Sequence, residues 1–228
     1  MVRTSENALL IFVKYPVPGT VKTRFAPELT PEQAAAVSRA LAEDTLSAIS
    51  NSACYQTSVC FAPASAWRGV RSWLGPDVSL QEQCEGDLGS RQFDAIRRAL
   101  EAGFTKAVII GSDCPTLAAS DIETAFESLE GSDLVIGPAQ DGGYYLIGAR
   151  RAIRSIFEGI SWSTERVLKQ TVERADEAGL SLELLDVKYD LDSYSDLRRH
   201  CRSARDGTED RPASRGLEVI DSILGGRV

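Results

Sequence analysis

The chain has 228 residues, of which 43% are hydrophobic and 25% are charged, and this composition is typical of a globular protein with a packed core. Its formal net charge of -8 excludes a broad nucleic-acid-binding surface, because contact with a phosphate backbone requires a basic stripe. The length fits one large α/β domain.

Cysteine usage indicates a reducing compartment, and hydropathy argues against a membrane span. The five cysteines include no C-x-x-C pair, which argues against a disulfide framework and against a zinc ribbon. The apolar run at residues 8–13 is too short to span a bilayer, and no cleavage site follows a basic start. We therefore expect a cytoplasmic protein with reduced thiols and no membrane span.

The N-terminal half alternates short apolar runs with amphipathic segments. Residues 8–13 form an unbroken apolar run, which is typical of a strand buried on both faces of a parallel sheet. Thr30 and Gln33 match a capping box, with Pro31 at the first helical position, and predict a helix that ends near Ile49. Further strands are expected at residues 57–61 and 78–83, and a helix at residues 89–102.

The second half continues this alternation. Residues 107–110 predict a central strand beside residues 8–13, and Ser120 with Glu123 repeats the capping-box pattern. Strands at residues 134–137 and 144–149, and helices at residues 164–178 and 193–202, complete the pattern. Because such alternation indicates βαβ units, the sequence predicts a Rossmann-like three-layer α/β/α fold with a mixed, mainly parallel sheet of about six or seven strands.

We expect one domain at residues 1–201, followed by a flexible connection and a short helix within residues 202–228. No large apolar residue lies between Arg202 and Arg215, so this segment lacks the apolar surface that would order it. Leu217, Ile220 and Leu224 then recur at helical spacing. That helix would dock on its own domain or on a second subunit, and the sequence does not decide between these. Docking on a second subunit would produce a homo-oligomer through the C-terminal segment.

A cationic loop follows the first strand. The sequence has no G-x-G-x-x-G motif and no complete Walker motif, which disfavours a Walker NTPase. Gly19 permits close approach of the backbone to a ligand, and an arginine can grip phosphate through two hydrogen bonds. We predict that Lys14, Gly19, Lys22, Thr23 and Arg24 bind a diphosphate; the alternative is a rigid, solvated surface loop.

Two aspartates follow predicted strands at the edge where α/β folds bind ligands. Asp113 comes just after the buried run at residues 107–110, where a carboxylate can hold Mg²⁺ or Mn²⁺ against a diphosphate. Asp192, in an Asp-Leu-Asp sequence with Asp190, lies before a predicted helix. We predict a metal site at Asp113 and Asp192, with an Asx turn at the first and a helix cap at the second as alternatives.

Two further loops carry residues suited to contact a substrate. Asp141 precedes a glycine pair between two strand candidates, and a plain hairpin turn would explain these glycines equally well. Asp87 lies in an acidic, glycine-rich loop suited to substrate hydroxyl groups or to a turn. The substrate-binding residues that we predict are Asp87, Gly142, Gly143, Tyr144 and Trp162, although aromatic residues at such positions are more often part of the core.

The only histidine, His200, lies near the far end of the chain in a predicted helix. Acid–base chemistry that depends on histidine is therefore excluded, and Cys114 has no histidine to activate it as a nucleophile. A general base must be a carboxylate, and we assign this role to Asp141.

Together these motifs resemble a known family. K-x-P-x-x-G-x-x-K-T-R, G-S-D-C-P-T-L, G-P-A-x-D-G-G-Y-Y-L-I-G, W-S-T and a late D-x-D are similar to those of a bacterial glycosyltransferase-A-like family, to which the name arsenosugar biosynthesis glycosyltransferase is often given. That family is related to the nucleotide-diphospho-sugar transferases and, more distantly, to molybdenum cofactor and phospholactate guanylyltransferases. The resemblance implies a GT-A fold, with the first loop on the nucleotide diphosphate and Asp113 at the metal.

The resulting expectation is a metal-assisted glycosyltransferase. A nucleotide sugar would bind through its diphosphate, and the sugar would pass to a hydroxyl group of a small-molecule acceptor. The first alternative is a nucleotidyltransferase, guanylyltransferase-like, in which an ionised phosphate or carboxylate attacks a nucleoside triphosphate and pyrophosphate leaves. The second alternative is a nucleotide-binding protein without catalytic activity.

Overall fold

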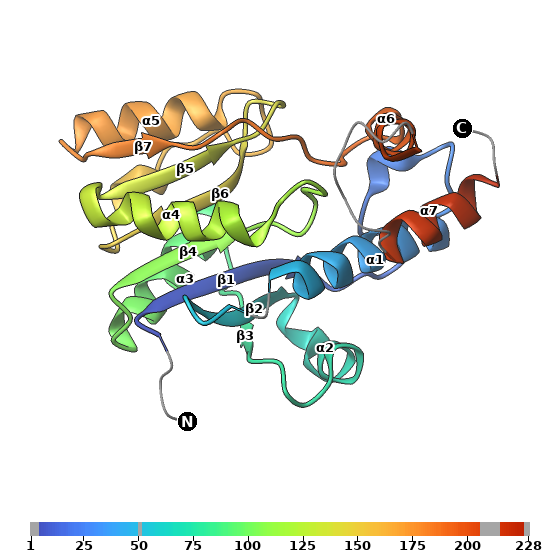
Figure 1. The fold of residues 1–228 in the computed structure, drawn as a ribbon, viewed down its shortest axis with the longest axis horizontal. Helices are drawn as coiled ribbons and strands as arrows, with labels where there is room; N and C mark the ends of the chain where they lie inside the picture. Colours follow the sequence, from blue (N-terminus) through green and yellow to red (C-terminus); the bar gives the residue numbers. More distant parts are fainter. Residues whose placement is uncertain (1–4, 50–51, 206–214, 226–228) are drawn as a thin grey trace.

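The computed structural model describes residues 5–49, 52–205 and 215–225, and their fold is a three-layer α/β/α sandwich (Figure 1). The central sheet has seven strands in the order β3-β2-β1-β4-β6-β5-β7. The strands are β1 (Asn7–Lys14), β2 (Gln56–Ala62), β3 (Leu80–Glu82), β4 (Lys106–Ile110), β5 (Leu134–Pro138), β6 (Tyr144–Ala149) and β7 (Leu182–Leu184). Only β6 runs antiparallel to its neighbours, so the predicted mixed, mainly parallel sheet is confirmed.

The helices connect these strands and cover both faces of the sheet. They are α1 (Pro31–Ile49), α2 (Trp67–Leu74), α3 (Leu88–Glu101), α4 (Ala119–Gly131), α5 (Val167–Glu177), α6 (Tyr194–Arg205) and α7 (Arg215–Leu224), with short 3-10 turns η1 (Thr23–Phe25), η2 (Ala64–Ala66) and η3 (Arg154–Phe157). The capping box predicted for α1 is present, because Gln33 N donates to Thr30 Oγ1 and Thr30 N donates to Gln33 Oε1. The sequence did not predict α2 or β7, since both are short.

The helix α4 begins two residues earlier than the sequence predicted. Its N-cap is Ala118, which has no side-chain acceptor, so the predicted cap at Ser120 is wrong. Asp121 takes over part of that function, because its carboxylate accepts a hydrogen bond from Ala118 N at 2.8 Å. A carboxylate in the first turn also favours the helix dipole, which explains why the helix forms without a serine cap.

Two core clusters lie on opposite faces of the sheet. Because successive residues of a strand point to opposite faces, Leu9, Ile11 and Val13 pack on one side and Ala8 and Leu10 on the other. Helices α1, α2 and α4 cover the first side, and α3, α5 and η3 cover the second. The unbroken apolar runs read from the sequence are therefore strands that are buried on both faces.

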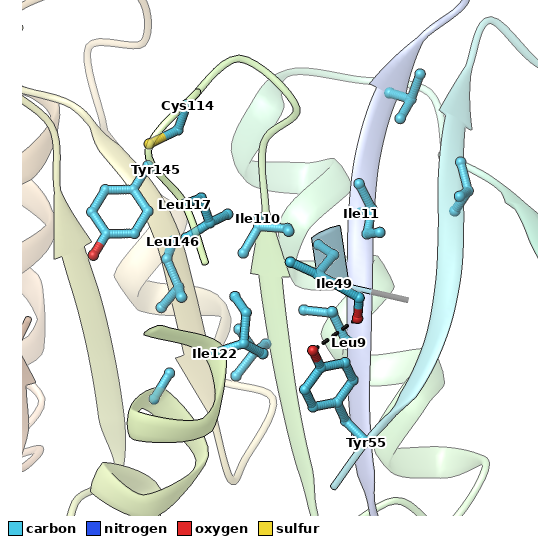
Figure 2. Packing of buried hydrophobic residues seen from close by; sticks show 14 of the residues in the cluster. Leu9, Ile11, Ile49, Tyr55, Ile110, Cys114, Leu117, Ile122, Tyr145 and Leu146 are labelled. Carbon is cyan, nitrogen blue, oxygen red and sulfur yellow. Dashed lines mark hydrogen bonds between the residues drawn. The ribbon is translucent and has the colours of Figure 1, made fainter. Parts of the chain in front are cut away.

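Figure 2 shows the cluster on the side that α1 and α4 cover. Leu9 of β1, Ile110 of β4 and Ile122 of α4 are fully buried there. The Tyr55 hydroxyl donates to the carbonyl oxygen of Ile49 at 2.8 Å, so this buried polar atom is satisfied. Burial of each such aliphatic side chain contributes about 1.5–3 kcal/mol to the free energy of unfolding.

A third core lies at one end of the molecule, beside the sheet rather than on it. We call it the C-terminal cluster, and its buried members are Phe25, Leu29, Ala34, Val37, Leu41, Leu191, Leu197, Cys201, Ile220 and Leu224. It joins α7 and α6 to α1 and to the loop after β1 (Figure 1). The apolar face of α7 therefore docks on its own chain, which decides between the two docking modes left open by the sequence.

Three further expectations from the sequence concern the segment after residue 201, membrane-spanning helices and the cysteines. Residues 202–205, expected as part of a flexible connection, belong to α6, while residues 206–214 lie outside the described residues. Among the helices of the described ranges, none combines the length and the apolar character needed to cross a bilayer. None of the five cysteines, all within the described ranges, is assigned to a disulfide bond.

Candidate functional site

A cavity of about 740 Å³ opens at the carboxyl edge of the parallel strands, within the volume range of small-molecule sites. Ten of the residues predicted from the sequence line it: Lys14, Lys22, Thr23, Arg24, Asp113, Asp141, Gly143, Tyr144, Trp162 and Asp192. The three motifs that lie far apart in the sequence thus meet at one place. Gly19, Asp87 and Gly142 do not line this cavity.

The parallel register of β1 and β4 explains why the first two motifs meet. Ile11 of β1 pairs with Ile110 of β4. Lys14 and Asp113 each follow their paired isoleucine by three residues, so both leave the sheet at the same edge. Adjacent parallel strands thereby bring a cation and a carboxylate to one cavity.

A backbone hydrogen bond brings the late aspartate to the same place. Leu191 N donates to the carbonyl oxygen of Asp113 at 3.0 Å, which fixes the segment before α6 against the loop after β4. The Leu191 side chain is fully buried in the C-terminal cluster. Asp192, the next residue, then faces the cavity.

Asp192 does not cap the following helix, so that alternative is wrong. The N-terminus of α6 is closed by Ser193 and Asp196: Ser193 N donates to Asp196 Oδ2 at 2.9 Å, and Asp196 N donates to Ser193 Oγ at 3.2 Å. The Asp192 carboxylate points instead to the first loop, where Arg24 Nη1 lies 3.6 Å from Asp192 Oδ2. The Asp192 carboxylate therefore takes no part in capping the helix and lines the cavity.

Three oxygen atoms surround the ammonium group of Lys22, and we call them the oxygen cage. Lys22 Nζ lies 2.9 Å from Asp113 Oδ2, 2.7 Å from the carbonyl oxygen of Leu191 and 3.5 Å from Asp192 Oδ1. The side chain of Lys22 is only 6% exposed, whereas those of Asp113 and Asp192 are 40% and 41% exposed. Burial by itself lowers the pKa of Lys22, but the two carboxylates outweigh it and hold this pKa above its ordinary value.

This pairing differs from the sequence prediction for Lys22. A lysine ammonium has three protons to donate, and the oxygen cage offers three acceptors. In this structure Lys22 therefore neutralises the predicted metal ligands and does not present a free cation to a phosphate. Lys14 binds Thr20 O at 2.6 Å and closes the loop, and the Arg24 side chain is 66% exposed at the cavity.

The turn between β5 and β6 holds the third motif. Asp141 Oδ1 accepts a hydrogen bond from Gly143 N at 2.8 Å, so the aspartate organises the turn, as the hairpin alternative requires. Gly142 has a φ of +86°, and a Cβ atom there would lie 2.2 Å from the carbonyl oxygen of Glu165. The turn and the loop after Trp162 are thus in direct contact, and both line the cavity.

Gly142 permits a direct test of that contact. We expect Gly142→Ala to lower the free energy of unfolding by roughly 3 kcal/mol, because an alanine combines left-handed backbone strain with the clash against Glu165. The matched control is Gly179→Ala: Gly179 also has a positive φ, of +64°, but a Cβ atom would meet nothing within 4 Å. That control should lose only about 1 kcal/mol in urea unfolding. Equal losses would mean that the contact with Glu165 contributes nothing.

The two predicted aromatic residues form a wall of the cavity. The Tyr144 hydroxyl donates to Gln92 Oε1 at 2.6 Å, and burial raises the pKa of this hydroxyl. Trp162 and Tyr144 both pack against the core on the α3 and α5 side while they line the cavity. These residues therefore belong to the core and line the cavity at the same time, and their substrate-binding role stays a prediction.

Asp87 and Gly19 have structural positions at the margin of the site. Asp87 is the N-cap of α3, and its carboxylate accepts a hydrogen bond from Ser90 N at 2.8 Å, so its acidic loop is a helix start. Gly19 has a φ of +79° in the turn of the first loop. Each residue shapes the backbone at the margin of the cavity, and neither is part of its lining.

Asp190 is among the lining residues that were not selected from the sequence. Asp190 lies in the cavity, and burial, together with the nearby carboxylates of Asp113, Asp192 and Asp141, raises its pKa to about 7. A carboxyl group with such a pKa can exchange a proton near neutral pH. The signal was its place in the Asp-Leu-Asp sequence, but only the folded structure shows that it is half-buried in the cavity beside other carboxylates.

The histidine and the thiol considered above are buried and do not line the cavity. His200 is 2% exposed within α6, and its Nδ1 lies 3.1 Å from the Tyr189 hydroxyl. Burial raises the pKa of the Cys114 thiol to about 12, so this thiol is protonated at neutral pH. The prediction that neither residue carries chemistry agrees with these positions.

A second cavity, of about 790 Å³, lies at the amino edge of the strands. Four of its charged residues form ion pairs with one another: Lys106 with Glu130, and Arg151 with Asp133 at 2.8 Å. Ligands of open α/β sheets bind at the carboxyl edge. The cavity that contains Asp113 is therefore the better candidate site.

The oxygen cage has the donor chemistry that Mg²⁺ or Mn²⁺ requires. Hard divalent ions prefer oxygen ligands, and magnesium sites commonly use one or two carboxylates and complete the shell with water and phosphate oxygens. Asp113 and Asp192 supply two carboxylates, and Leu191 supplies a carbonyl oxygen. Among the described residues, no group of three or more histidine, cysteine or acidic side chains forms a denser metal centre.

Comparison with known proteins agrees with this architecture. A crystal structure from Desulfovibrio desulfuricans G20, provisionally described as a nucleotide-diphospho-sugar transferase, is 33% identical, with 96% of each chain covered and a TM-score of 0.88. The chain is 28% identical to the 2-phospho-L-lactate guanylyltransferase of Natrialba magadii over 214 residues, which are 88% of each sequence. It is also 28% identical to the 2-phospho-L-lactate guanylyltransferase of Methanoculleus marisnigri over 188 residues.

These findings refine the resemblance drawn from the motifs. The expected nucleotide-diphospho-sugar transferase fold is confirmed. The two curated relatives, however, carry the name of a guanylyltransferase and not that of an arsenosugar glycosyltransferase. A family model matches residues 45–164, more than half of the chain. The chain therefore belongs to the bacterial family described as uncharacterized protein conserved in bacteria (DUF2064).

Proposed function

We propose that this protein is a nucleotidyltransferase that acts on a nucleoside triphosphate and a small acceptor with an ionised phosphate or carboxylate. The acceptor oxygen attacks the α-phosphorus, the bond from that phosphorus to its bridging oxygen breaks, and pyrophosphate leaves. The observation that carries this proposal is the convergence of Asp113 and Asp192 on one cation position, in a cavity that Lys14 and Arg24 also line. Such a combination of acidic metal ligands and nearby cations suits a polyphosphate.

Nucleotidyl transfer fits the available groups better than glycosyl transfer to a hydroxyl. No histidine lines the cavity, and Asp141, the predicted base, already accepts a hydrogen bond from Gly143 N within its turn. An ionised acceptor needs no general base, because its attacking oxygen carries no proton. The names of the two curated relatives, both guanylyltransferases, support the same reaction class.

Each part of the cavity has a proposed role in this reaction. Asp113 and Asp192 would hold a divalent ion, which when bound neutralises charge on the triphosphate. Arg24, exposed at the cavity, would grip phosphate oxygens, and Lys14 would support the loop that carries it. The neutral wall formed by Tyr144, Gln92 and Trp162 would receive an uncharged part of a substrate.

A glycosyltransferase is the second candidate. The specific observation in its favour is the 33% identity, over almost the whole chain, to the Desulfovibrio desulfuricans protein. In this reaction a sugar would move from a nucleotide sugar to a hydroxyl group, and a base would be required for an inverting reaction. Asp190, with its pKa raised to about 7, would serve that role better than Asp141.

The products distinguish these candidates. The purified protein is incubated with Mg²⁺, panels of nucleoside triphosphates and nucleotide sugars, and small phosphorylated or hydroxylated acceptors. We expect pyrophosphate to form from a triphosphate together with a phosphorylated or carboxylated acceptor. Release of a nucleoside diphosphate from a nucleotide sugar would establish the glycosyltransferase instead. A nucleotide that raises the melting temperature without any turnover would indicate a binding protein.

A further inference from the structure

The ammonium group of Lys22 occupies the same oxygen cage that would hold a divalent ion. Its distances to Asp113 Oδ2 and to the Leu191 carbonyl oxygen, 2.9 Å and 2.7 Å, are those of full hydrogen bonds. Asp192 Oδ1 is within 3.5 Å. The side chain is 6% exposed, so the cage encloses the ammonium group rather than touching it at the surface.

A divalent ion and this ammonium group cannot share the cage. Both require the lone pairs of the same carboxylate oxygens, and two positive charges a few ångströms apart repel strongly where water is excluded. One of the two cations must therefore leave before the other is bound. Within the described part of the chain, the cage has two carboxylates and one buried cation, so its charge is already largely compensated.

The position of Lys22 in the chain suits a side chain that leaves the cage. Lys22 is the N-cap of η1 and has a φ of +49°, a left-handed conformation that is uncommon outside glycine. Lys22 itself lines the cavity. An ammonium group released from the carboxylates therefore has open space in which phosphate oxygens would bind.

We propose that Lys22 is a placeholder cation: it neutralises Asp113 and Asp192 in the metal-free protein, and a divalent ion must displace it. This inference rests on the metal site of the proposed function. Displacement would convert Lys22 from a structural counter-ion into a free cation in the cavity. The phosphate-binding role predicted for Lys22 from the sequence would then belong to the metal-loaded protein alone.

The direct test measures the affinity for Mn²⁺ alone, by the electron paramagnetic resonance signal of unbound Mn²⁺. Replacing Lys22 by methionine keeps the bulk of the side chain and removes the competing charge. We expect Lys22→Met to bind Mn²⁺ roughly tenfold more tightly than the natural protein. Lys14→Met is the matched control, because it removes one positive charge from the same cavity, where the ammonium group binds Thr20 O rather than a carboxylate.

The outcomes of this titration separate the inference from the function on which it rests. Unchanged or weaker Mn²⁺ binding by Lys22→Met would overturn the inference and leave the metal site in place. An equal gain in Lys14→Met would also overturn it, since the effect would then be general attraction. Absence of Mn²⁺ binding in the natural protein and in both variants would remove the metal from the proposed function, and the inference with it.

A second measurement uses the natural protein and does not depend on the folding of a variant. The chain contains only five lysines, so a protein labelled with ¹⁵N at the lysine Nζ atoms gives a small set of signals. A buried, hydrogen-bonded ammonium group exchanges its protons slowly and remains visible. We expect Mg²⁺ to remove or shift the Lys22 signal and to leave that of Lys106, at the opposite edge of the sheet, unchanged. An unmoved Lys22 signal at a Mg²⁺ concentration that saturates the protein would overturn the inference.

Discussion

Asp113→Asn is expected to lower kcat for nucleotidyl transfer by roughly two to three orders of magnitude. Asparagine has nearly the same shape as aspartate but carries no charge, so the cage would lose one of its two carboxylates. A divalent ion would then be held by Asp192 and a carbonyl oxygen, which is too little negative charge for tight binding. The measurement is pyrophosphate release at saturating Mg²⁺, with the substrate pair found in the product screen.

The fold should survive this substitution. The Asp113 side chain is 40% exposed, and the asparagine Oδ1 atom can still accept a hydrogen bond from Lys22, so the melting temperature should change by only a few degrees. Asp133→Asn is the matched control, because Asp133 also pairs with a cation, Arg151, but lies at the amino edge of the sheet. A full rate in Asp113→Asn, or an equal loss in Asp133→Asn, would remove Asp113 from the site.

Leu191→Ala is expected to damage stability and catalysis together. The Leu191 side chain is fully buried in the C-terminal cluster, so its truncation should lower the free energy of unfolding by about 3 kcal/mol. Its backbone binds Asp113 O and Lys22 Nζ, and the next residue is Asp192. A shift of this segment would therefore displace the Leu191 carbonyl oxygen and the Asp192 carboxylate, which are two of the three members of the cage. We expect kcat to fall by roughly tenfold or more.

The control for Leu191 comes from the same cluster. Leu197 of α6 is also fully buried there, but it lies in the first turn of the helix and is not adjacent in sequence to a member of the cage. Leu197→Ala should lose a similar free energy of unfolding, measured by urea titration, and retain most of its kcat below the unfolding transition. If the two variants lost activity equally, stability of the cluster, rather than the position of Leu191, would explain the effect.

The sequence predicted the core of the fold because hydrophobic patterning is local. Strands buried on both faces form unbroken apolar runs, so β1 and β4 were recognisable as central neighbours. Patterns that are too short for this signal were missed: β7 has three residues, and α2 has eight, of which only Val70 is buried. Helix starts depend on a few hydrogen bonds, so α4 begins one residue before its predicted cap.

The sequence was less informative about what each polar residue binds. An aspartate in a loop can cap a helix, order a turn or face a ligand, and the local sequence is similar in all three cases. In the folded protein Asp87 caps a helix and Asp141 orders a turn. Asp192 faces Lys22 and Arg24. These differences arise from neighbours that lie far away in the chain.

By itself, the sequence determined the layer architecture and the edge of the sheet where the motifs gather, and it predicted a mechanism without histidine. Each of these follows from local periodicity, from strand order or from composition. Only the tertiary structure decided that Lys22 is enclosed by Asp113 and Asp192, that Asp190 lies half-buried in the same cavity and that α7 docks on its own chain. The physical reason is that charge pairing and burial depend on contacts between residues about 80 to 170 positions apart, and no local pattern encodes such contacts.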